Sequence, residues 1–256
     1  SLETSFERLS TGKRINSAVD DAAGLAIGKD LESRVSGLNQ AVRNVNDGIS
    51  MVQIMEGSYD EVTTILQRMR DLAVQAANDS LTTTERTYLD NEATKLASSL
   101  DSVMNQAKFA NKDLVVATNT STTVVIHSGA DADDTIEITL SNNTTDDAAG
   151  LGVDDSGVVL GTKVGATAAI TDIDDALDAV ASRRADLGAS QSQLESVVRN
   201  LANVAENTAA AAGRVMDTDY ASETANLTKA QILQQAATSI LAQANAQPQA
   251  VLALLQ

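Results

Sequence analysis

Cysteine and tryptophan are absent from this chain, and its 256 residues include a single proline, Pro248. The lack of cysteine excludes disulfides, thiol nucleophiles and cysteine-ligated metals. A single proline favours long uninterrupted helices, because proline removes a backbone donor and clashes inside a helix. Aromatic residues make up only 2% of the chain, and much of the apolar share is alanine. Such small side chains suit closely packed helices better than a thick globular core.

Positive charge is also scarce. The chain has 18 Lys and Arg residues against 35 Asp and Glu residues, for a formal net charge of −17. Nucleic-acid binding needs clustered cations, which no stretch offers, so we expect no nucleic-acid partner. No segment supplies the run of about 18 apolar residues that a membrane helix needs. The start at Ser1 has neither the basic nor the apolar part of a signal peptide. We therefore expect no membrane span and no cleavable signal.

The residues that usually carry catalysis or bind metals form no recognisable site. His127 is the only histidine, so no second imidazole can complete a zinc site and no Ser-His pair is indicated. The aspartates within residues 131–134 lack the spacing of an EF-hand loop. We therefore predict that the protein is not an enzyme and has no cofactor and no bound metal.

Hydrophobic periodicity predicts long coiled-coil helices. Apolar residues alternate at spacings of four and three between Leu38 and Ala73, which is typical of a coiled-coil seam. A second seam of the same kind runs from Leu194 to Val215, and a final helix follows Asp219. The seam residues expected to make coiled-coil or assembly contacts are Leu38, Val42, Val45, Ile49, Val52, Leu66, Leu194, Val198, Leu201, Leu233, Ile240 and Leu255.

Local signals mark where helices begin. After a break at residues 78–80, Thr82 and Glu85 have the spacing of a capping box, which predicts a helix to about Ala107. Helix returns from about Ile173. Negative charge is favoured at a helix start, and we interpret the following aspartates in this way: Asp172, Asp174, Asp175, Asp178, Asp217 and Asp219.

The middle of the chain has a different composition. Residues 112–171 are rich in Thr, Ser, Asn, Asp and Gly, and β-branched runs at 115–116, 123–126 and 135–140 predict short strands. The predicted fold is therefore mainly α: a long antiparallel coiled-coil helical rod made from the N- and C-terminal halves, with a small β-hairpin region in the middle. Its apolar end segments must pair with each other or with another copy.

Several stretches of the sequence resemble bacterial flagellin, in the order in which that family has them. At the start, residues 6–18, beginning Phe6-Glu7-Arg8-Leu9, and residues 20–27 are similar to the family's N-terminal signature. Residues 67–78 are similar to the segment that ends its first long helix. Towards the other end, the similarity continues in residues 184–189, 206–207, 231–236 and 241–245, and the lone proline falls where the family has one.

The resemblance implies a structural subunit that polymerises into the flagellar filament for swimming motility. Such a subunit is exported by the flagellar type III apparatus and is extracellular. Its partners would be further copies of itself, an export chaperone that holds residues 227–255, and the filament cap and junction proteins. The family's usual N-terminal residues would precede Ser1, so we expect an incomplete N-terminal helix. The short middle region predicts a thin filament without large outer domains.

The resemblance also implies five segments with distinct roles. These are residues 1–20, the remainder of the N-terminal helix and a connecting spoke; 21–111, the N-terminal half of a helical core domain; 112–171, the hairpin or variable region; 172–216, the C-terminal half of the core domain; and 217–256, the C-terminal inner-tube helix.

A receptor site is a further implication of the resemblance. Flagellins recognised by Toll-like receptor 5 present an Arg and a Leu on the first long helix and a Glu on the next. By motif these residues fall on Arg68, Leu72 and Glu92, with Gln67 and Gln75 beside them. The spacing of Arg68 and Leu72 places them one helical turn apart on one face.

Two alternative functions remain open from the sequence. One is a flagellin-like surface binding protein or adhesin that uses the polar stretch 121–157. The other is a hook-filament junction protein of similar architecture.

Overall fold

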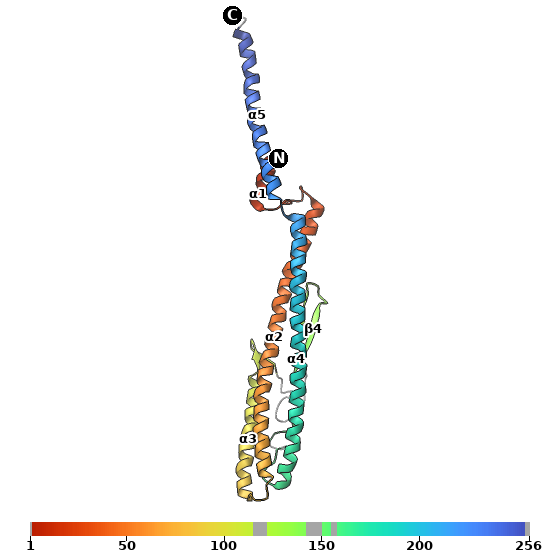
Figure 1. Ribbon diagram of the computed structural model, residues 1–256, viewed down its shortest axis with the longest axis vertical. Coiled ribbons are helices and arrows are strands. Elements are labelled where there is room, and N and C mark those ends of the chain that lie inside the picture. Colours follow the sequence, from red (N-terminus) through yellow and green to blue (C-terminus); the bar gives the residue numbers. More distant parts are fainter. Residues whose placement is uncertain (1, 115–121, 142–149, 155–157, 254–256) are drawn as a thin grey trace. The chain divides into compact units, whose positions relative to one another are not determined.

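The chain is mostly helical in the computed structural model (Figure 1), which describes residues 2–114, 122–141, 150–154 and 158–253. The helices in these ranges are α1 (Leu2–Thr11), α2 (Ala22–Ala76), α3 (Thr83–Gln106), α4 (Lys163–Met216) and α5 (Tyr220–Ala253). They form two compact units. Residues 37–203 make up the bundle unit, and residues 1–36 with 204–256 make up the terminal unit. The mainly helical class predicted from the seams is confirmed.

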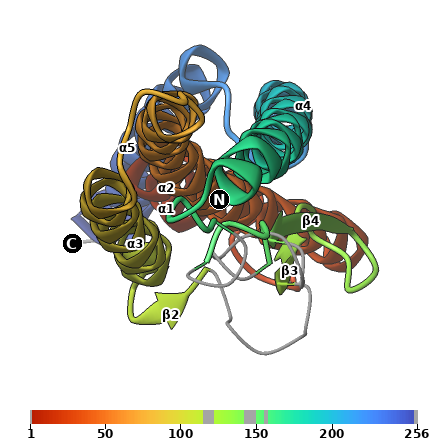
Figure 2. The ribbon, with the colours of Figure 1, turned by 90° about the horizontal axis from the view of Figure 1, so that it is seen from below.

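In the bundle unit, α2, α3 and α4 lie side by side as an antiparallel bundle (Figure 2). Arg70 of α2 pairs with Asp174 of α4, with 2.6 Å between Nε and Oδ1, while Asp60 lies 3.0 Å from Arg184. A later residue of α2 therefore pairs with an earlier residue of α4, so the two helices run antiparallel. Helices of this length gain most of their stability by burying an apolar face rather than from intrinsic propensity.

Most of the two predicted seams lies in the core of the bundle unit. Val45, Val52, Leu66 and Leu194 are fully buried, and Leu38 and Leu201 are each 8% exposed. Three further seam residues are half-buried: Val42, Ile49 and Val198. The 4-3 pattern thus marks the faces along which these helices pack.

Within the bundle unit, a β-hairpin packs against the helices. Strands β3 (Thr122–His127) and β4 (Thr135–Ser141) are antiparallel, and Ile126 lies opposite Ile136. Alternate apolar side chains of the pair are buried, among them Val124, Ile138 and Leu140. This hairpin confirms two of the predicted strands. The third, at residues 115–116, lies outside the described residues.

A second, shorter hairpin was not predicted. Strands β1 (Lys108–Phe109) and β2 (Lys112–Asp113) are joined by Ala110 and Asn111, whose φ angles are 46° and 65°. Two successive left-handed residues are typical of the tightest hairpin turn. Alanine rarely adopts that conformation, so the sequence carries little signal for the turn.

Helix α4 begins at Lys163, before the start near Ile173 that the sequence predicted. Thr162 caps it: its Oγ1 accepts a hydrogen bond from the Gly165 amide at 3.1 Å, and its carbonyl accepts one from Ala166 at 2.8 Å. The capping interpretation is therefore wrong for four aspartates that lie inside α4: Asp172, Asp174, Asp175 and Asp178. The predicted capping box of α3 is confirmed, because Thr82 and Glu85 bond to each other's backbone.

In the terminal unit, α1 packs against α5 and two connecting segments pair through their backbones. Lys13 forms an antiparallel bridge with Asp217, while the Arg14 amide donates to the Met216 carbonyl at 2.6 Å. Asp217 therefore lies in this bridge and is not a helix cap. Asp219 does cap α5 as predicted, since its Oδ1 accepts from the Ala221 amide at 2.9 Å.

Candidate functional site

The residues matched to a receptor site come together on neighbouring helices of the bundle unit. Arg68 of α2 donates from Nε and Nη2 to the same carboxylate oxygen of Glu92 on α3, at 3.0 and 2.6 Å. Their side chains are 55% and 43% exposed. The antiparallel packing of α2 and α3 thus forms an accessible ion pair between residues 24 positions apart.

The other matched residues divide between the surface and the core. Gln67 and Gln75 are exposed, whereas Leu72 is only 1% exposed. Arg68 therefore lies at the exposed edge of this face and Leu72 at its buried side. Residues four apart are turned by about 40° around a helix, which is enough to leave Arg68 at the rim while Leu72 enters the bundle.

Sequence reasoning missed the residue that organises the connection between α2 and α3. Arg86 is 9% exposed, and its guanidinium donates to three main-chain carbonyls, those of Ala76, Asn78 and Leu81, at 2.7 to 2.9 Å. These bonds bind α3 to the end of α2 and to the loop between them. Carbonyl acceptors belong to every residue, so no motif marks such a site.

An ion pair across the other side of α2 joins it to α4. Arg70 donates to both carboxylate oxygens of Asp174, at 2.6 and 3.3 Å. This two-point contact holds the pKa of the Asp174 carboxyl below its usual range. Because both side chains are nearly half exposed, water screens the pair and its share in stability is small.

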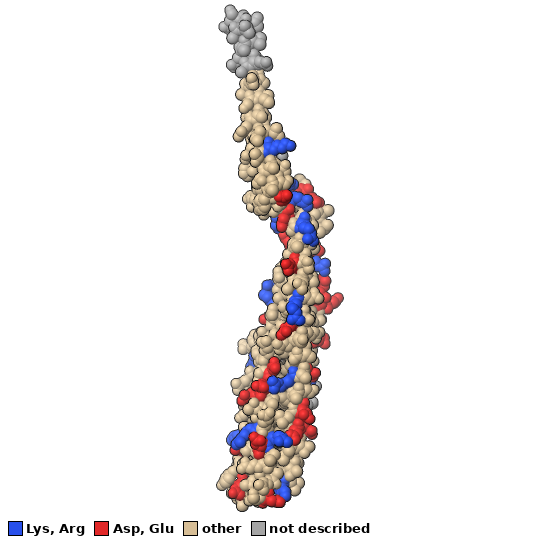
Figure 3. Space-filling view, viewed as in Figure 1, with Lys and Arg blue, Asp and Glu red and all other residues tan. Residues whose placement is uncertain are grey.

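The apolar side chains of α5 lie largely uncovered in the terminal unit. Leu233 and Ile240 are 59% and 66% exposed. Their neighbours Ile232 and Leu241 are each 60% exposed, and Leu255 lies outside the described residues. On the face shown in Figure 3, the described part of α5 is almost free of red and blue, unlike the other helices. A helix with this surface needs a partner to exclude water.

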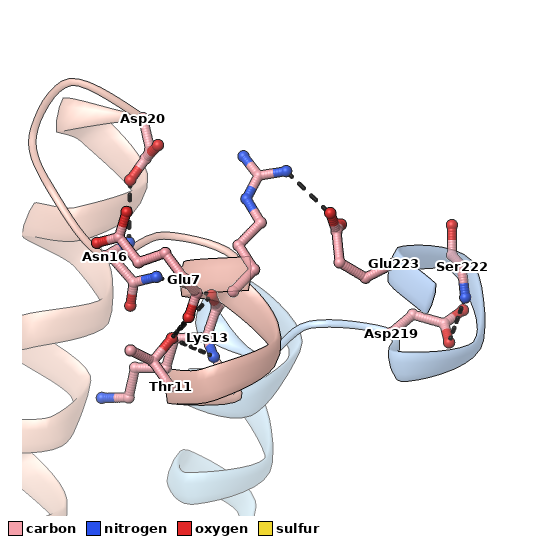
Figure 4. Close-up of polar contacts among 9 residues, drawn as sticks. Glu7, Thr11, Lys13, Asn16, Asp20, Asp219, Ser222 and Glu223 are labelled. Atoms are coloured by element: carbon pink, nitrogen blue, oxygen red, sulfur yellow. Dashed lines mark hydrogen bonds and ion pairs between the residues drawn. The ribbon is translucent and has the colours of Figure 1, made fainter. Parts of the chain in front are cut away.

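Polar contacts fix the start of α5 against α1 (Figure 4). Arg8 lies 3.8 Å from Glu223, whose side chain is 10% exposed. Nearby, Thr11 donates to the Glu7 carbonyl at 2.9 Å, and the Asp20 carboxylate accepts from the Asn16 and Ser17 amides. These amide bonds hold the pKa of Asp20 below its ordinary value. The segment between α1 and α2 is therefore shaped by specific bonds rather than by packing alone.

Glu32 carries the largest pKa shift that the structure resolves. Its carboxylate lies 2.5 Å from Nζ of Lys13 and 2.7 Å from Nζ of Lys29. The two ammonium groups lower the pKa of Glu32 to about 2. The cluster joins α2 to the connection that follows α1 within the terminal unit.

Over the ranges that the structure describes, no group of three or more His, Asp or Glu side chains could hold a metal ion. None of the described helices combines the length and apolarity needed to cross a membrane.

Comparisons with known proteins agree with this arrangement. Residues 1–120 match the bacterial flagellin N-terminal helical region and residues 170–255 match the C-terminal helical region. A flagellin of Halalkalibacterium halodurans is 41% identical over 99% of this chain and 92% of its own length. The flagellar filament 31.3 kDa core protein of Treponema maltophilum is 38% identical over 98% of this chain and 91% of its own length.

Solved structures agree as well. The crystal structure of Bacillus cereus flagellin has a TM-score of 0.53 at 26% identity and covers 66% of this chain and 94% of that one. A putative flagellar hook-associated protein from Vibrio parahaemolyticus has a TM-score of 0.65 at 18% identity, over 77% of this chain and all of that one, which shows a shared fold only. Family matches at both ends and relatives similar along nearly the whole length establish that this chain belongs to the bacterial flagellins, a structural and non-enzymatic family.

Proposed function

We propose that this flagellin, a subunit of the extracellular flagellar filament, is held in the polymer by the apolar face of α5. The observation that carries the proposal is the surface of α5, where Leu233 and Ile240 are both more than half exposed. No charged residue follows Lys229 in the sequence. Leaving such a face in water is unfavourable by about 25 cal/mol for each Å² of apolar surface, and packing against neighbouring copies removes that cost.

A charge placed on this face tests the proposal. Ile240→Asp should prevent the chain from extending sonicated filament seeds, measured by sedimentation and negative-stain microscopy. The matched control is Ser239→Asp, since Ser239 is the exposed polar neighbour. Both variants are compared with the unmodified chain. If the Ile240→Asp variant extends the filament seeds as well as the unmodified chain does, the proposed role of α5 is wrong.

The apolar face of α5 also bears on how the chain is exported. We propose that the chain leaves the cell through the flagellar type III apparatus and that a chaperone covers residues 227–255 until then. Ile232 and Leu241, each 60% exposed, are the kind of surface that a chaperone must shield from aggregation. Gel filtration of the chain with the flagellar export chaperone should show a complex that Ile232→Asp weakens. Equal binding by the variant would argue against this contact.

A second candidate function, agonism of Toll-like receptor 5, is supported by the exposed pair of Arg68 and Glu92. The pair offers a cation and a carboxylate side by side on two rigid helices, with Gln67 and Gln75 also accessible. In this proposal Leu72 does not contact the receptor directly, because its side chain is buried. Its packing in the bundle holds the helix that carries Arg68. Contacts with such charged anchors often dominate a protein interface.

Arg68→Ala tests the receptor proposal in a cell reporter assay and in direct binding to the receptor ectodomain. The matched control is Arg70→Ala, which removes an arginine of the same helix whose partner lies on α4 instead of α3. We expect Arg68→Ala to weaken binding at least about tenfold and Arg70→Ala to change it little. Equal binding by both variants would remove Arg68 from the site.

The alternatives of an adhesin and a junction protein have less support. Relatives similar over almost the whole chain are named as flagellins or filament core proteins. The hook-associated protein shares the fold alone. Partners at the filament tip and base, the cap and junction proteins, remain part of the proposal because a growing filament must contact both.

A further inference from the structure

One cation interrupts the uncharged surface of α5. Between Thr224 and the end of the sequence the only charged residue is Lys229. It is exposed, and no ion pair reaches it from the described residues. Glu223, the other charged residue of α5, is only 7% exposed and faces Arg8. Covering α5 in a filament would therefore bury Lys229 beside apolar surface, which is costly unless a carboxylate meets it.

Lys229 stands between two hollows of the terminal unit. On one side a groove of about 660 Å³ lies between α1 and α5, lined by residues that include Ser5, Arg8 and Glu223. On the other side a shallow apolar hollow of about 480 Å³ is formed by Ala225, Thr228, Ile232 and Leu233 together with Lys229. A partner that seats on this second hollow would place its own charge beside the ammonium group.

Helix α1 carries the complementary surface on the face turned away from α5. Ser5 is 6% exposed and marks the side that packs against α5. At about 100° per residue, Glu3 and Glu7 lie almost opposite Ser5, and Phe6 lies between the two sides. Both glutamates are exposed, and Phe6 is 51% exposed. Because they point away, these glutamates cannot reach Lys229 of their own chain.

We propose that Glu3 and Glu7 of one copy bind Lys229 of a second copy, with Phe6 of the first seated in the hollow of Ile232 and Leu233. The inference rests on the proposed function and identifies which faces of the terminal units meet. A contact between two different faces is heterologous, so it leaves one free face of each kind and extends as a helical polymer. Since no other charged residue follows Glu223 in α5, the ion pair also sets the register between neighbouring helices.

Charge reversal tests the pairing directly. Lys229→Glu sets like charges against each other, and so does the double variant Glu3→Lys with Glu7→Lys. Each is expected to raise the critical concentration for seeded polymerisation at least about tenfold, because like charges across an interface are strongly unfavourable. Combining all three substitutions restores opposite charges and should bring the critical concentration back close to that of the unmodified chain. Added salt should lessen the defect of each reversed variant.

The control is Lys95→Glu, which reverses an exposed lysine of α3 in the bundle unit and is expected to change polymerisation little. Circular dichroism of each monomer verifies that its helices are intact. The pairing is overturned if the combined variant polymerises no better than Lys229→Glu, or if the reversed variants polymerise like the unmodified chain. Failure of the unmodified chain to extend its own seeds would instead overturn the proposed function, and the pairing with it.

Discussion

Arg86 Nε donates a hydrogen bond to the Ala76 carbonyl at 2.8 Å, and this contact joins the first turn of α3 to the last turn of α2. The last carbonyls of a helix have no partner within the helix, so the guanidinium satisfies one acceptor that would otherwise depend on water. Two further carbonyls, of Asn78 and Leu81, complete the set. The Arg86 side chain thus holds the connection between α2 and α3, the two helices that carry Arg68 and Glu92.

Removing this guanidinium should destabilise the bundle unit. Arg86→Met retains most of the aliphatic stem but leaves three carbonyls without their donor, and we expect a loss of about 3 kcal/mol in the free energy of unfolding. Arg86→Lys keeps the charge without the planar fork and should lose about half as much. Urea unfolding followed by circular dichroism measures both. A loss for Arg86→Met no greater than that for Arg70→Met, a variant of the half-exposed arginine that pairs with Asp174, would contradict this role of Arg86.

Two glycines of α2 should respond in opposite ways to alanine. A Cβ at Gly48 would collide with Cδ1 of Ile126 on β3, whereas nothing lies within 4 Å of a Cβ at Gly57. Gly48→Ala therefore displaces the hairpin, with an expected loss of about 1 to 3 kcal/mol. Gly57→Ala should gain up to about 1 kcal/mol, because alanine is the better helix former. Thermal unfolding measures both variants. If Gly48→Ala and Gly57→Ala change the melting temperature equally, the hairpin does not pack closely against α2 at Gly48.

Much of this fold could be predicted because its signals are periodic and local. The 4-3 spacing from Leu38 identified the buried face of α2, and the pair of Thr82 and Glu85 placed the start of α3. The start of α4 was missed because residues 163–171 share the Thr, Ala and Gly content of the region before them. The cap that decides the boundary is one threonine, Thr162.

The candidate sites were less predictable, because they depend on which side of a helix is covered. Spacing placed Arg68 and Leu72 on one face, but only the position of the neighbouring helices shows that one is exposed and the other buried. The role of Arg86 could not be predicted for a different reason. Its acceptors are main-chain carbonyls, which every residue has, so no sequence motif marks them. Lys229 was overlooked as well, although the absence of charge around it is visible in the sequence.

The capping box of α3 offers a small and local test. Thr82 Oγ1 accepts from the Glu85 amide at 3.4 Å, and the Glu85 carboxylate accepts from the Thr82 amide at 2.7 Å. Thr82→Ala should lower the free energy of unfolding by about 1 kcal/mol. Thr84→Ala alters an exposed threonine of the same turn and should change it much less. Chemical denaturation measures the difference, and equal values for the two variants would exclude the capping role.

The cluster around Glu32 predicts a definite dependence on pH. Its pKa falls from an ordinary value of 4.5 to about 2 in the folded chain, because the ammonium groups of Lys13 and Lys29 stabilise the carboxylate. A group with a lowered folded-state pKa contributes stability that is complete above the unfolded value. That contribution is lost as the pH falls from about 4.5 towards about 2. The carboxylate is about one third exposed, so solvent screening keeps the effect modest.

Glu32→Gln removes the charge and retains the shape of the side chain. At neutral pH the variant should melt at a lower temperature than the unmodified chain, and the gap should narrow below pH 4.5 and close near pH 2. Thermal melts followed by circular dichroism at four pH values measure the gap. Asp30→Gln serves as the control, because Asp30 is an exposed acid on the same helix and should shift the melting temperature little at any pH. A gap for Glu32→Gln that stays constant down to pH 2 would mean that the carboxylate acts through its shape alone, and that the two lysines do not stabilise its charge.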